Sequence, residues 1–364
     1  MRCAFLLSGD YPDLGKEEAI SVIKVVDYRL TGRLMFADFD GDLPYKLLKR
    51  LALTKNICRI LFECRIEDLT DNMKRFDWNS VYEKDFCLRI YNFNKENPIT
   101  EKSIKKIKNK KNDKIKKYSE KELAGYVWRS VNNPKVNLQN PKTLIQMFII
   151  KSKVYCGLLI YENKEDFESR KAHLRPFPHP SSLHPKVARA LVNISGIKED
   201  EILLDPFCGT GGFLIEAGLM KTKSIGYDIN KMMIDGCKEN LKYFNIKNFK
   251  IKNKNALSIT DKFDYAVTDL PYGLNSNAMA MYEKDWKKHR INKKVGAEDF
   301  IENLEKFYLK FLKNLRKILK KKAIIVFPSY VGYKELLKKS KFKIEFEFEN
   351  YVHRSLKREI IKIS

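Results

Sequence analysis

The spacing of hydrophobic positions separates segments with the period of strands from segments with the period of helices. The clearest strand pattern lies near the end of the chain, where Phe342, Ile344, Phe346 and Phe348 alternate strictly with polar residues. Another apolar run at 359–363 follows, and we expect the two to pair as an antiparallel hairpin beside a parallel sheet. In this half the other predicted strands are 202–204, 224–227, 250–252, 264–268 and 323–327, and the predicted helices are 184–194, 213–220, 231–244, 311–319 and 334–339.

The first 160 residues mix strand and helix patterns in a way that indicates α+β structure. Ser119 and Glu122 have the spacing of a capping box, which predicts a helix that begins there and runs to about Arg129. Residues 86–93 alternate in the manner of a half-buried strand. The other predicted strands are 1–8, 25–30, 33–39, 58–64, 135–138, 144–150 and 153–161, and the other predicted helices are 16–23 and 44–54.

A charged and then proline-rich segment separates the two halves. It ends in the run from Arg175 to Pro180, and because prolines disfavour helix in the residues before them, we expect a semi-rigid linker. The predicted organisation is an N-terminal α+β, ferredoxin-like region at 1–75, a second α+β domain at 76–161, the linker at 162–180 and an α/β domain at 181–364.

The charge of the chain points to a polyanionic partner. The formal net charge is +25 and the isoelectric point is near 9.5, which favours nucleic acid, although a Lys-, Ile- and Asn-rich composition also arises from genome bias or adaptation to heat. Lysines crowd the segment 101–117. Because a solvated loop or helix face explains that segment equally well, none of its lysines is assigned as an RNA ligand.

Cysteine and histidine usage predicts an intracellular protein without a metal. The seven cysteines are scattered and never form C-x-x-C, so neither a disulfide framework nor a zinc site is expected and the compartment is a reducing cytoplasm. His173, His179 and His184 lie close together but lack partner ligands at suitable spacing. The most apolar segment, 143–161, is interrupted by Lys151 and Lys153, so it cannot be a membrane span of about 20 apolar residues.

A glycine-rich turn follows the predicted strand at 202–204. It reads Asp205-Pro-Phe207-Cys-Gly209-Thr210-Gly211-Gly, and a helix follows at once. Glycines let backbone amides approach a ligand closely and a helix N-terminus adds donors, so this turn predicts a nucleotide-like cofactor. The third glycine position of a dinucleotide fingerprint holds Leu214, and no P-loop lysine follows, so nicotinamide and nucleoside triphosphates are disfavoured.

Two further strand ends carry polar groups on the same predicted edge. Asp228 ends the strand at 224–227 and is placed to accept hydrogen bonds from ribose hydroxyls. The strand at 264–268 ends in Asp269-Leu-Pro271-Tyr272. A carboxylate that can accept amine hydrogens, a stiffened turn and a flat ring suit amine chemistry on a nucleobase, although such tetrads also mark ordinary turns.

The order of these motifs over residues 177–364 resembles the class I S-adenosylmethionine-dependent methyltransferases, and the glycine loop resembles that of the RNA and DNA amino-methyltransferases. The resemblance implies a Rossmann-like α/β fold with S-adenosylmethionine as cofactor. Asn255 departs from the acidic residue usual at its position, and Leu270 stands where proline is commoner. The implied cofactor-binding residues are Asp205, Phe207, Gly209, Thr210, Gly211, Asp228, Asn255 and Ala256, and the implied catalytic residues are Asp269, Leu270, Pro271 and Tyr272.

Residues 80–160 resemble a THUMP domain, an RNA-binding module of tRNA-modifying enzymes, in their order of strand, helix, Asn-Pro and closing strands. The segment 351–358 resembles the closing signature of the archaeal enzymes that methylate the N2 amine of guanosine 10 in tRNA. Together these resemblances imply tRNA as the partner and mono- or dimethylation of guanosine 10 as the reaction.

Three other interpretations stay open at this point. A sister family with a similar pairing of domains methylates guanosine 6 of tRNA. A DNA adenine methyltransferase shares the Asp-x-Pro-Tyr motif but is not expected to carry an RNA-binding module. A non-catalytic THUMP RNA-binding protein is disfavoured by the intact Gly209, Gly211, Asp228 and Asp269. The sequence also leaves open the oligomeric state and the need for a small activating protein partner.

Overall fold

The computed structural model describes residues 1–23, 25, 27–39, 41, 43–95, 118–179, 182–272, 297–353 and 356–364. The lysine-rich segment 101–117, Pro180, Gly273 and Arg354 lie outside the described residues. The chain forms two compact units, the first made of residues 1–12, 25–44 and 54–163 and the second of residues 13–24, 45–53 and 164–364. Within the described ranges, no helix is both long enough and apolar enough to cross a membrane.

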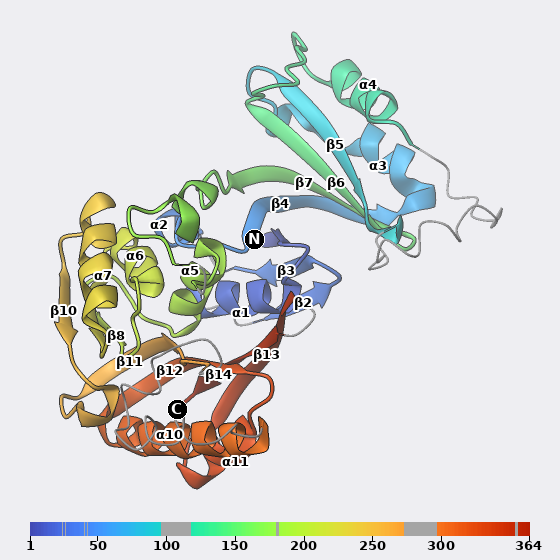
Figure 1. Ribbon diagram of the computed structural model, residues 1–364. Coiled ribbons are helices and arrows are strands. Elements are labelled where there is room, and N and C mark those ends of the chain that lie inside the picture. The colour runs from blue at the N-terminus through green and yellow to red at the C-terminus, as the bar shows by residue number, and fades with distance from the viewer. Residues whose placement is uncertain are drawn as a thin grey trace. The chain divides into compact units, whose positions relative to one another are not determined.

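The first unit is built on one seven-stranded sheet in the order β2-β3-β1-β4-β7-β6-β5 (Figure 1). Its neighbouring strands pair antiparallel except β5 and β6, which pair parallel. The strands are β1 Arg2–Leu7, β2 Tyr28–Thr31, β3 Leu34–Asp38, β4 Thr54–Arg65, β5 Phe86–Asn92, β6 Thr143–Ile150 and β7 Lys153–Glu162. The helices are α3 Leu69–Arg75 and α4 Glu120–Ser130, with 3-10 turns η1 Ile66–Asp68, η2 Trp78–Ser80 and η3 Phe93–Lys95.

Ser119 caps the start of α4 as predicted, since its hydroxyl accepts a hydrogen bond from the Glu122 amide at 3.1 Å, which is one half of a capping box. The predicted strand at 135–138 is wrong: only an isolated bridge joins Val136 to Phe86. Here the Asn137 side chain accepts from the backbone amides of Gln139 and Asn140, which turns the chain instead of extending it.

The second unit contains the predicted α/β domain. Its sheet has the order β10-β9-β8-β11-β12-β14-β13, parallel from β10 to β12 and antiparallel from β12 through β14 to β13, so the Rossmann-like fold class and its C-terminal hairpin are confirmed. The strands are β8 Ile202–Asp205, β9 Lys223–Asp228, β10 Phe249–Asn253, β11 Phe263–Asp269, β12 Leu319–Pro328, β13 Ile344–His353 and β14 Leu356–Ile363.

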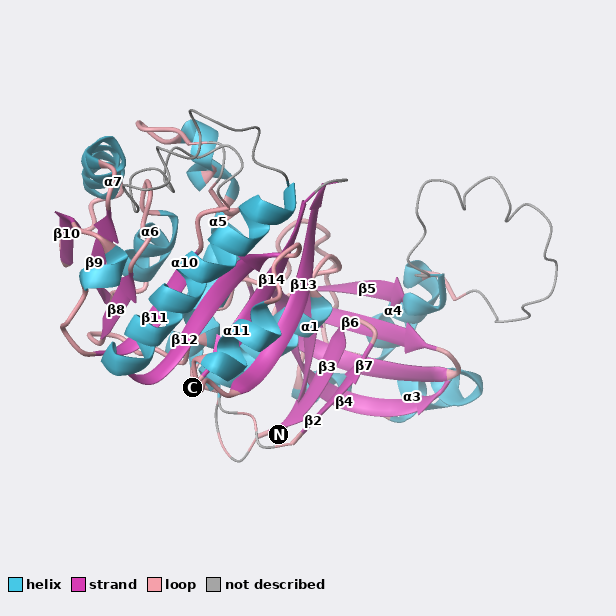
Figure 2. Cartoon of the chain, turned by 60° about the horizontal axis from the view of Figure 1, so that its bottom comes forward, coloured by secondary structure: helices cyan, strands magenta, loops and turns pink. Residues whose placement is uncertain are grey.

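Helices cover this sheet. Figure 2 shows α10 and α11 lying along one face, where Phe307, Phe311 and Leu337 join the core formed by β11, β12 and β14. The helices are α1 Pro12–Ile23, α2 Tyr45–Leu48, α5 Pro185–Ile194, α6 Gly212–Leu219, α7 Lys231–Tyr243, α10 Ala297–Ile318 and α11 Tyr333–Lys339, with 3-10 turns η5 Glu168–Arg170, η6 Ala172–Leu174 and η7 Ala256–Ser258.

Two short N-terminal segments, 13–24 and 45–53, are built into the second unit. The buried carboxylate of Glu18 on α1 accepts hydrogen bonds from the amides of Ala52 and Leu53 at 2.8 and 2.7 Å and from the side chain of Asn193 on α5 at 2.7 Å. The predicted helix at 44–54 is therefore wrong beyond α2. The chain leaves the helix so that these amides can reach Glu18, a partner that lies outside the local sequence.

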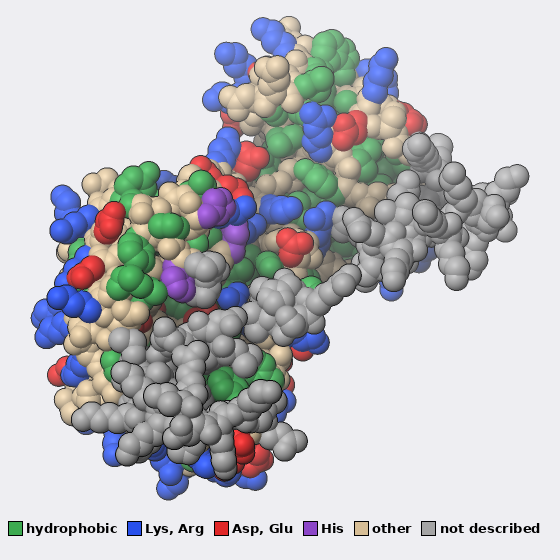
Figure 3. All heavy atoms as spheres, viewed as in Figure 1, with side chains coloured by type: hydrophobic (Ala, Val, Ile, Leu, Met, Phe, Trp, Pro, Cys, Tyr) green, Lys and Arg blue, Asp and Glu red, His purple; other side chains and the backbone are tan. Residues whose placement is uncertain are grey.

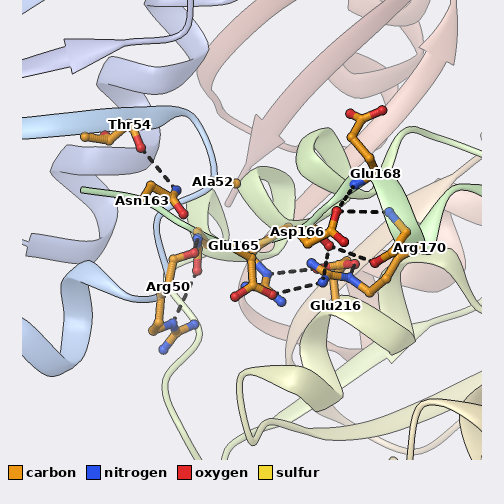
Figure 4. Close-up of polar contacts among 12 residues, drawn as sticks. Arg50, Ala52, Thr54, Asn163, Glu165, Asp166, Glu168, Arg170 and Glu216 are labelled. Atoms are coloured by element: carbon orange, nitrogen blue, oxygen red, sulfur yellow. Dashed lines mark hydrogen bonds and ion pairs between the residues drawn. The ribbon is translucent and has the colours of Figure 1, made fainter. Parts of the chain in front are cut away.

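The charged segment after residue 163 is also part of the second unit. Arg170 lies 2.8 Å from the carboxylate of Glu216 on α6 and 2.9 Å from Glu165 (Figure 4). Arg189 on α5 lies 2.8 Å from the same Glu216 carboxylate. All of these side chains except Glu165 are buried. The ion pairs hold residues 165–170 against α5 and α6.

Candidate active site

Three carboxylates end neighbouring parallel strands of the second unit. Asp205, Asp228 and Asp269 are the last residues of β8, β9 and β11, and β8 lies between the other two strands. Because these strands are parallel, all three side chains lie on the same edge of the sheet, the edge where open α/β sheets bind ligands. The charges of Asp228 and Asp269 add to burial in raising the pKa of Asp205. The structure thus brings together the three acidic residues that the sequence singled out.

The glycine loop has the conformation that its sequence requires. Gly209 and Gly211 adopt left-handed φ angles of 48° and 88°, which other residues adopt only with strain. A Cβ atom on Gly211 would lie 2.8 Å from the Cys237 sulfur, whereas one on Gly209 would meet no described atom within 4 Å. Gly211 lets α7 pack close behind the loop, and Gly209 leaves open space at its front.

Asp205 and Phe207 anchor the glycine loop to the core of the second unit. The buried Asp205 carboxylate accepts hydrogen bonds from the Thr268 hydroxyl at 2.8 Å and the Phe207 amide at 3.2 Å. Burial raises the pKa of Asp205 to about 8, so it is mostly protonated at neutral pH. The Phe207 ring packs edge-on against Phe311, 4.9 Å between centroids. Phe207 therefore packs into the core of the second unit.

Thr210 is held by hydrogen bonds to groups outside the glycine loop. Its carbonyl accepts from the Asn240 side chain at 3.0 Å, and its hydroxyl lies 3.4 Å from that of Ser182. Asn240, on α7, also bonds both backbone groups of Phe177, at 2.9 and 3.0 Å. One amide side chain thus connects the loop, α7 and the segment before α5.

The Asp228 carboxylate accepts two backbone amides, from Gly209 at 3.0 Å and from Asn230 at 2.8 Å. Burial raises its pKa, which these hydrogen bonds oppose. Asn255 follows β10, and its side-chain oxygen accepts from the Leu257 amide at 2.8 Å, which caps η7. The carbonyl of the buried Ala256 accepts from the Asn314 side chain of α10 at 3.2 Å. Asn255 and Ala256 therefore have observed structural roles beside the loop.

The segment after β11 is held in place by three tyrosines and an arginine. The Tyr272 hydroxyl donates to the Asp269 carboxylate at 2.6 Å, and the Arg358 Nε donates to the same hydroxyl at 2.8 Å. The Tyr308 hydroxyl donates to the Pro271 carbonyl at 2.9 Å, and the Tyr330 hydroxyl donates to the Tyr272 carbonyl at 2.7 Å. The catalytic candidates therefore lie in a rigid turn rather than in a free loop.

The pKa of Asp269 lies closer to neutral pH than that of an ordinary carboxyl group. Burial raises its pKa to about 6, while the Arg358 charge and the Tyr272 hydrogen bond oppose that rise. Its side chain keeps 21% exposure, so a substrate can reach it. At neutral pH it is mostly ionised and can accept hydrogens from an amine.

Sequence reasoning missed the partners of this segment. Tyr308 lies in the apolar stripe of α10, Tyr330 follows β12, and Arg358 lies on the last strand. Tyr308 and Tyr330 look like ordinary core or surface residues in their local sequence. Arg358 ends the segment 351–358 that resembles a closing signature, but its local sequence indicates no role at Tyr272 or Asp269. A tyrosine within a fully buried helix face was the available signal, since a buried hydroxyl needs a hydrogen-bond partner. Among the described residues no group of three or more His, Cys, Asp and Glu side chains is arranged to hold a metal ion.

A parallel sheet with an antiparallel final hairpin, a glycine loop after β8 and an acidic tetrad after β11 define the class: an S-adenosylmethionine-dependent methyltransferase of class I. Residues 172–284 match the family model described as an RMKL-like methyltransferase domain. The crystal structure of TrmN from Thermus thermophilus matches with a TM-score of 0.53 at 15% identity, covering 100% of this chain and 99% of that one, and supports the fold.

Relatives of higher identity define the family within that class. The tRNA (guanine(10)-N2)-dimethyltransferase of Methanocaldococcus jannaschii is 33% identical over 77% of this chain and 85% of its own length. The enzyme of the same name from Methanothermobacter thermautotrophicus is 29% identical over 99% of this chain and 98% of its own length. The chain belongs to the family of tRNA (guanine(10)-N2)-dimethyltransferases.

Proposed function

We propose that this chain transfers methyl groups from S-adenosylmethionine to the exocyclic N2 amine of guanosine 10 in tRNA, once or twice. The observation that carries the proposal is the Asp269 carboxylate, held by Tyr272 at the end of β11 on the same sheet edge as the glycine loop. The names of the two relatives support guanosine N2 as the target atom and position 10 as its place.

The ends of β8 and β9 fit an adenosine cofactor. The open space in front of Gly209 would admit part of the cofactor. The first backbone amides of α6 would donate hydrogen bonds to an anionic group of the cofactor. Asp228 would accept the ribose hydroxyls, with Asn255 and Ala256 beside the base and Asp205, Phe207, Thr210 and Gly211 supporting the loop. When bound, S-adenosylmethionine supplies an electrophilic methyl group on a sulfonium centre.

Asp269 would make the amine reactive. The lone pair of guanine N2 is delocalised into the ring, so the nitrogen attacks only when its hydrogens are engaged and it can rehybridise. Asp269 and the backbone carbonyl of Leu270 would accept those hydrogens and orient the nitrogen. On methylation the nitrogen would lose a proton, and a carboxylate with a pKa of about 6 could take it up at neutral pH.

Pro271 and Tyr272 would position the base. Pro271 restricts the backbone of the turn, and its carbonyl is held by Tyr308. A guanosine in a tRNA helix must leave the stack before its amine can reach Asp269, and the Tyr272 ring would pack against the extruded base. The half-buried Tyr272 cannot swing freely, because its hydroxyl and its carbonyl are both hydrogen-bonded.

The first unit would bind the RNA. Its β5, α4, β6 and β7 follow the order expected of a THUMP domain over residues 80–160, and lysine and arginine side chains are spread over the visible surface of the molecule (Figure 3). With a formal net charge of +25, the chain would bind tRNA with a strong dependence on salt.

The substrate assignment is tested by methyl transfer from labelled S-adenosylmethionine to unmodified tRNA transcripts, followed by nuclease digestion and mass spectrometry. We expect methylated guanosine at position 10, and we expect a transcript with adenosine at position 10 to accept no label. Label that disappears only when guanosine 6 is replaced would move the chain's activity to the sister family. Tight tRNA binding without transfer would favour a non-catalytic RNA-binding protein or a missing activating partner.

A further inference from the structure

Arg358 on β14 begins a chain of hydrogen bonds that ends on Asp269. Its Nε donates to the Tyr272 hydroxyl at 2.8 Å, and that hydroxyl donates to Asp269 Oδ1 at 2.6 Å. An arginine side chain can only donate, so the Tyr272 oxygen must accept from it and must direct its own hydrogen elsewhere. The carboxylate of Asp269 receives that hydrogen. Arg358 thereby sets the direction of the whole chain.

The arginine also brings a buried charge to the site. Arg358 is 8% exposed, and its Nη2 lies 3.9 Å from Asp269 Oδ2. It comes from the antiparallel hairpin, where it pairs in register with Pro328 at the end of β12. The hairpin therefore contributes a cation to an edge whose strand ends carry three acidic residues.

We propose that Arg358 is the positioning residue of the catalytic turn: it directs the Tyr272 hydroxyl onto one oxygen of Asp269 and keeps the carboxylate ionised, so that its other oxygen can accept the guanine amine. This inference rests on the proposed methyl transfer. A purely structural ion pair is the competing explanation, since buried pairs are weak evidence for stability and can usually be replaced at little cost.

The two explanations predict different effects on the pKa of Asp269. Among the described residues, the titratable and charged groups around Asp269 are Tyr272 on its own turn, Arg358 on β14, Asp205 on β8 and Tyr308 on α10. Burial raises the pKa of Asp269 to about 6, and Arg358 is the largest influence that lowers it. Protonated Asp269 cannot accept an amine hydrogen at that oxygen, so activity falls as pH drops through its pKa. Without the Arg358 charge, that fall begins at a higher pH.

The test is the pH profile of single-turnover methyl transfer to tRNA for the wild type, Arg358→Gln and Arg358→Lys. Glutamine keeps an N–H donor but no charge, and lysine keeps the charge. For Arg358→Gln we expect the acidic limb to move up by about one pH unit, which means a rate roughly fivefold below wild type near pH 6, approaching tenfold below about pH 5, and close to wild type above about pH 8. Arg358→Lys keeps the limb near its original place.

Lys321→Gln is the matched control, because it removes one positive charge from an exposed side chain at the opposite end of β12, paired with Asp264 at 2.8 Å. It is expected to leave the profile unchanged. Binding of S-adenosylhomocysteine and of tRNA, measured at each pH, shows that each variant is folded and saturated. If Arg358→Gln does not fold, Tyr272→Phe provides the test instead. This variant keeps the aromatic ring and removes the hydroxyl between Arg358 and Asp269, and we expect the acidic limb of its pH profile to move up as well.

An unshifted limb, with the rate lowered equally at every pH, overturns the proposal and leaves Arg358 a structural residue. If the wild type binds both ligands but transfers no methyl group, the proposed function itself is wrong. That result is distinct from an unshifted acidic limb in Arg358→Gln. A double-mutant cycle of Tyr272→Phe and Arg358→Gln adds a second criterion, since residues in one hydrogen-bonded chain should not lose activity additively. Additive losses would count against a role of Arg358 that acts through the Tyr272 hydroxyl.

Discussion

At the scale of single residues, the glycine loop depends on the backbone of Gly211. Its φ of 88° is strained for any residue with a Cβ, and that Cβ would lie 2.8 Å from the Cys237 sulfur. We expect Gly211→Ala to destabilise the protein by more than the roughly 1–2 kcal/mol of left-handed strain alone. Thermal or denaturant unfolding measures that cost, and titration with S-adenosylhomocysteine measures the loss of cofactor affinity.

Gly196 offers the matched control for this prediction. It has a similar φ of 82°, but a Cβ there would meet nothing within 4 Å. Gly196→Ala should therefore cost only the strain and leave cofactor affinity unchanged. Adding Cys237→Ala to Gly211→Ala should recover part of the lost stability. Equal costs for the two glycine variants would show that the sulfur contact does not matter.

The sequence identified the residues of the site whose chemistry is local. Asp205, Asp228 and Asp269 end apolar runs, so their place on one sheet edge followed from the strand pattern. The residues that orient them were not predictable in this way. Arg358 lies 86 positions from Tyr272, and Tyr308 lies 37 positions from Pro271. Only the folded sheet brings these donors to the turn after β11.

At the scale of elements, Asn240 on α7 joins the glycine loop to the segment before α5. Its side chain bonds both backbone groups of Phe177 and the carbonyl of Thr210. We expect Asn240→Ala to lower the free energy of unfolding by about 1–3 kcal/mol, because buried backbone groups lose their partner. The affinity for S-adenosylhomocysteine should fall as well, since the loop loses an anchor. Calorimetric unfolding and titration measure the two effects.

Asn248→Ala serves as the control, because Asn248 is exposed and only its backbone carbonyl bonds β9. It should change neither quantity. If Asn240→Ala lowered stability but left cofactor affinity intact, the connection between the proline-rich segment and the loop would have no part in binding.

Element prediction succeeded where the hydrophobic period is strong and failed where polar partners are remote. The alternation of Phe346 and Phe348 identified β13 and its hairpin correctly. The helix predicted at 44–54 ends at Leu48, because Ala52 and Leu53 donate to Glu18 more than thirty residues earlier. The strand predicted at 135–138 gave way to the hydrogen bonds of Asn137. Both errors arose from side chains that compete for backbone groups.

At the scale of the whole molecule, the boundary between the units does not follow the order of the chain. The first sheet joins β4 to β7 across the boundary expected at residue 75, and α1 packs in the second unit through Glu18 and Asn193. Periodicity could not indicate this, because a helix with one apolar face does not specify which sheet it covers. The expected division at 75 and at 161 stays a prediction for the RNA-binding region.

The central claim for the whole molecule is that a single carboxylate prepares the guanine amine for methyl transfer. Asp269→Asn in the full chain tests it most directly, because the side chain keeps its shape and loses its charge. Asp264→Asn is the control, since Asp264 lies on the same strand but pairs with Lys321 at the opposite end. Both variants are compared for single-turnover transfer to unmodified tRNA and for binding of S-adenosylhomocysteine and tRNA.

We predict that Asp269→Asn lowers the rate of methyl transfer by at least about 100-fold, while both dissociation constants stay within about twofold of wild type. Asp264→Asn should transfer methyl groups at the wild-type rate. Transfer by Asp269→Asn at a rate close to wild type, with both ligands bound, would contradict the role assigned to this carboxylate and with it the mechanism built on the end of β11.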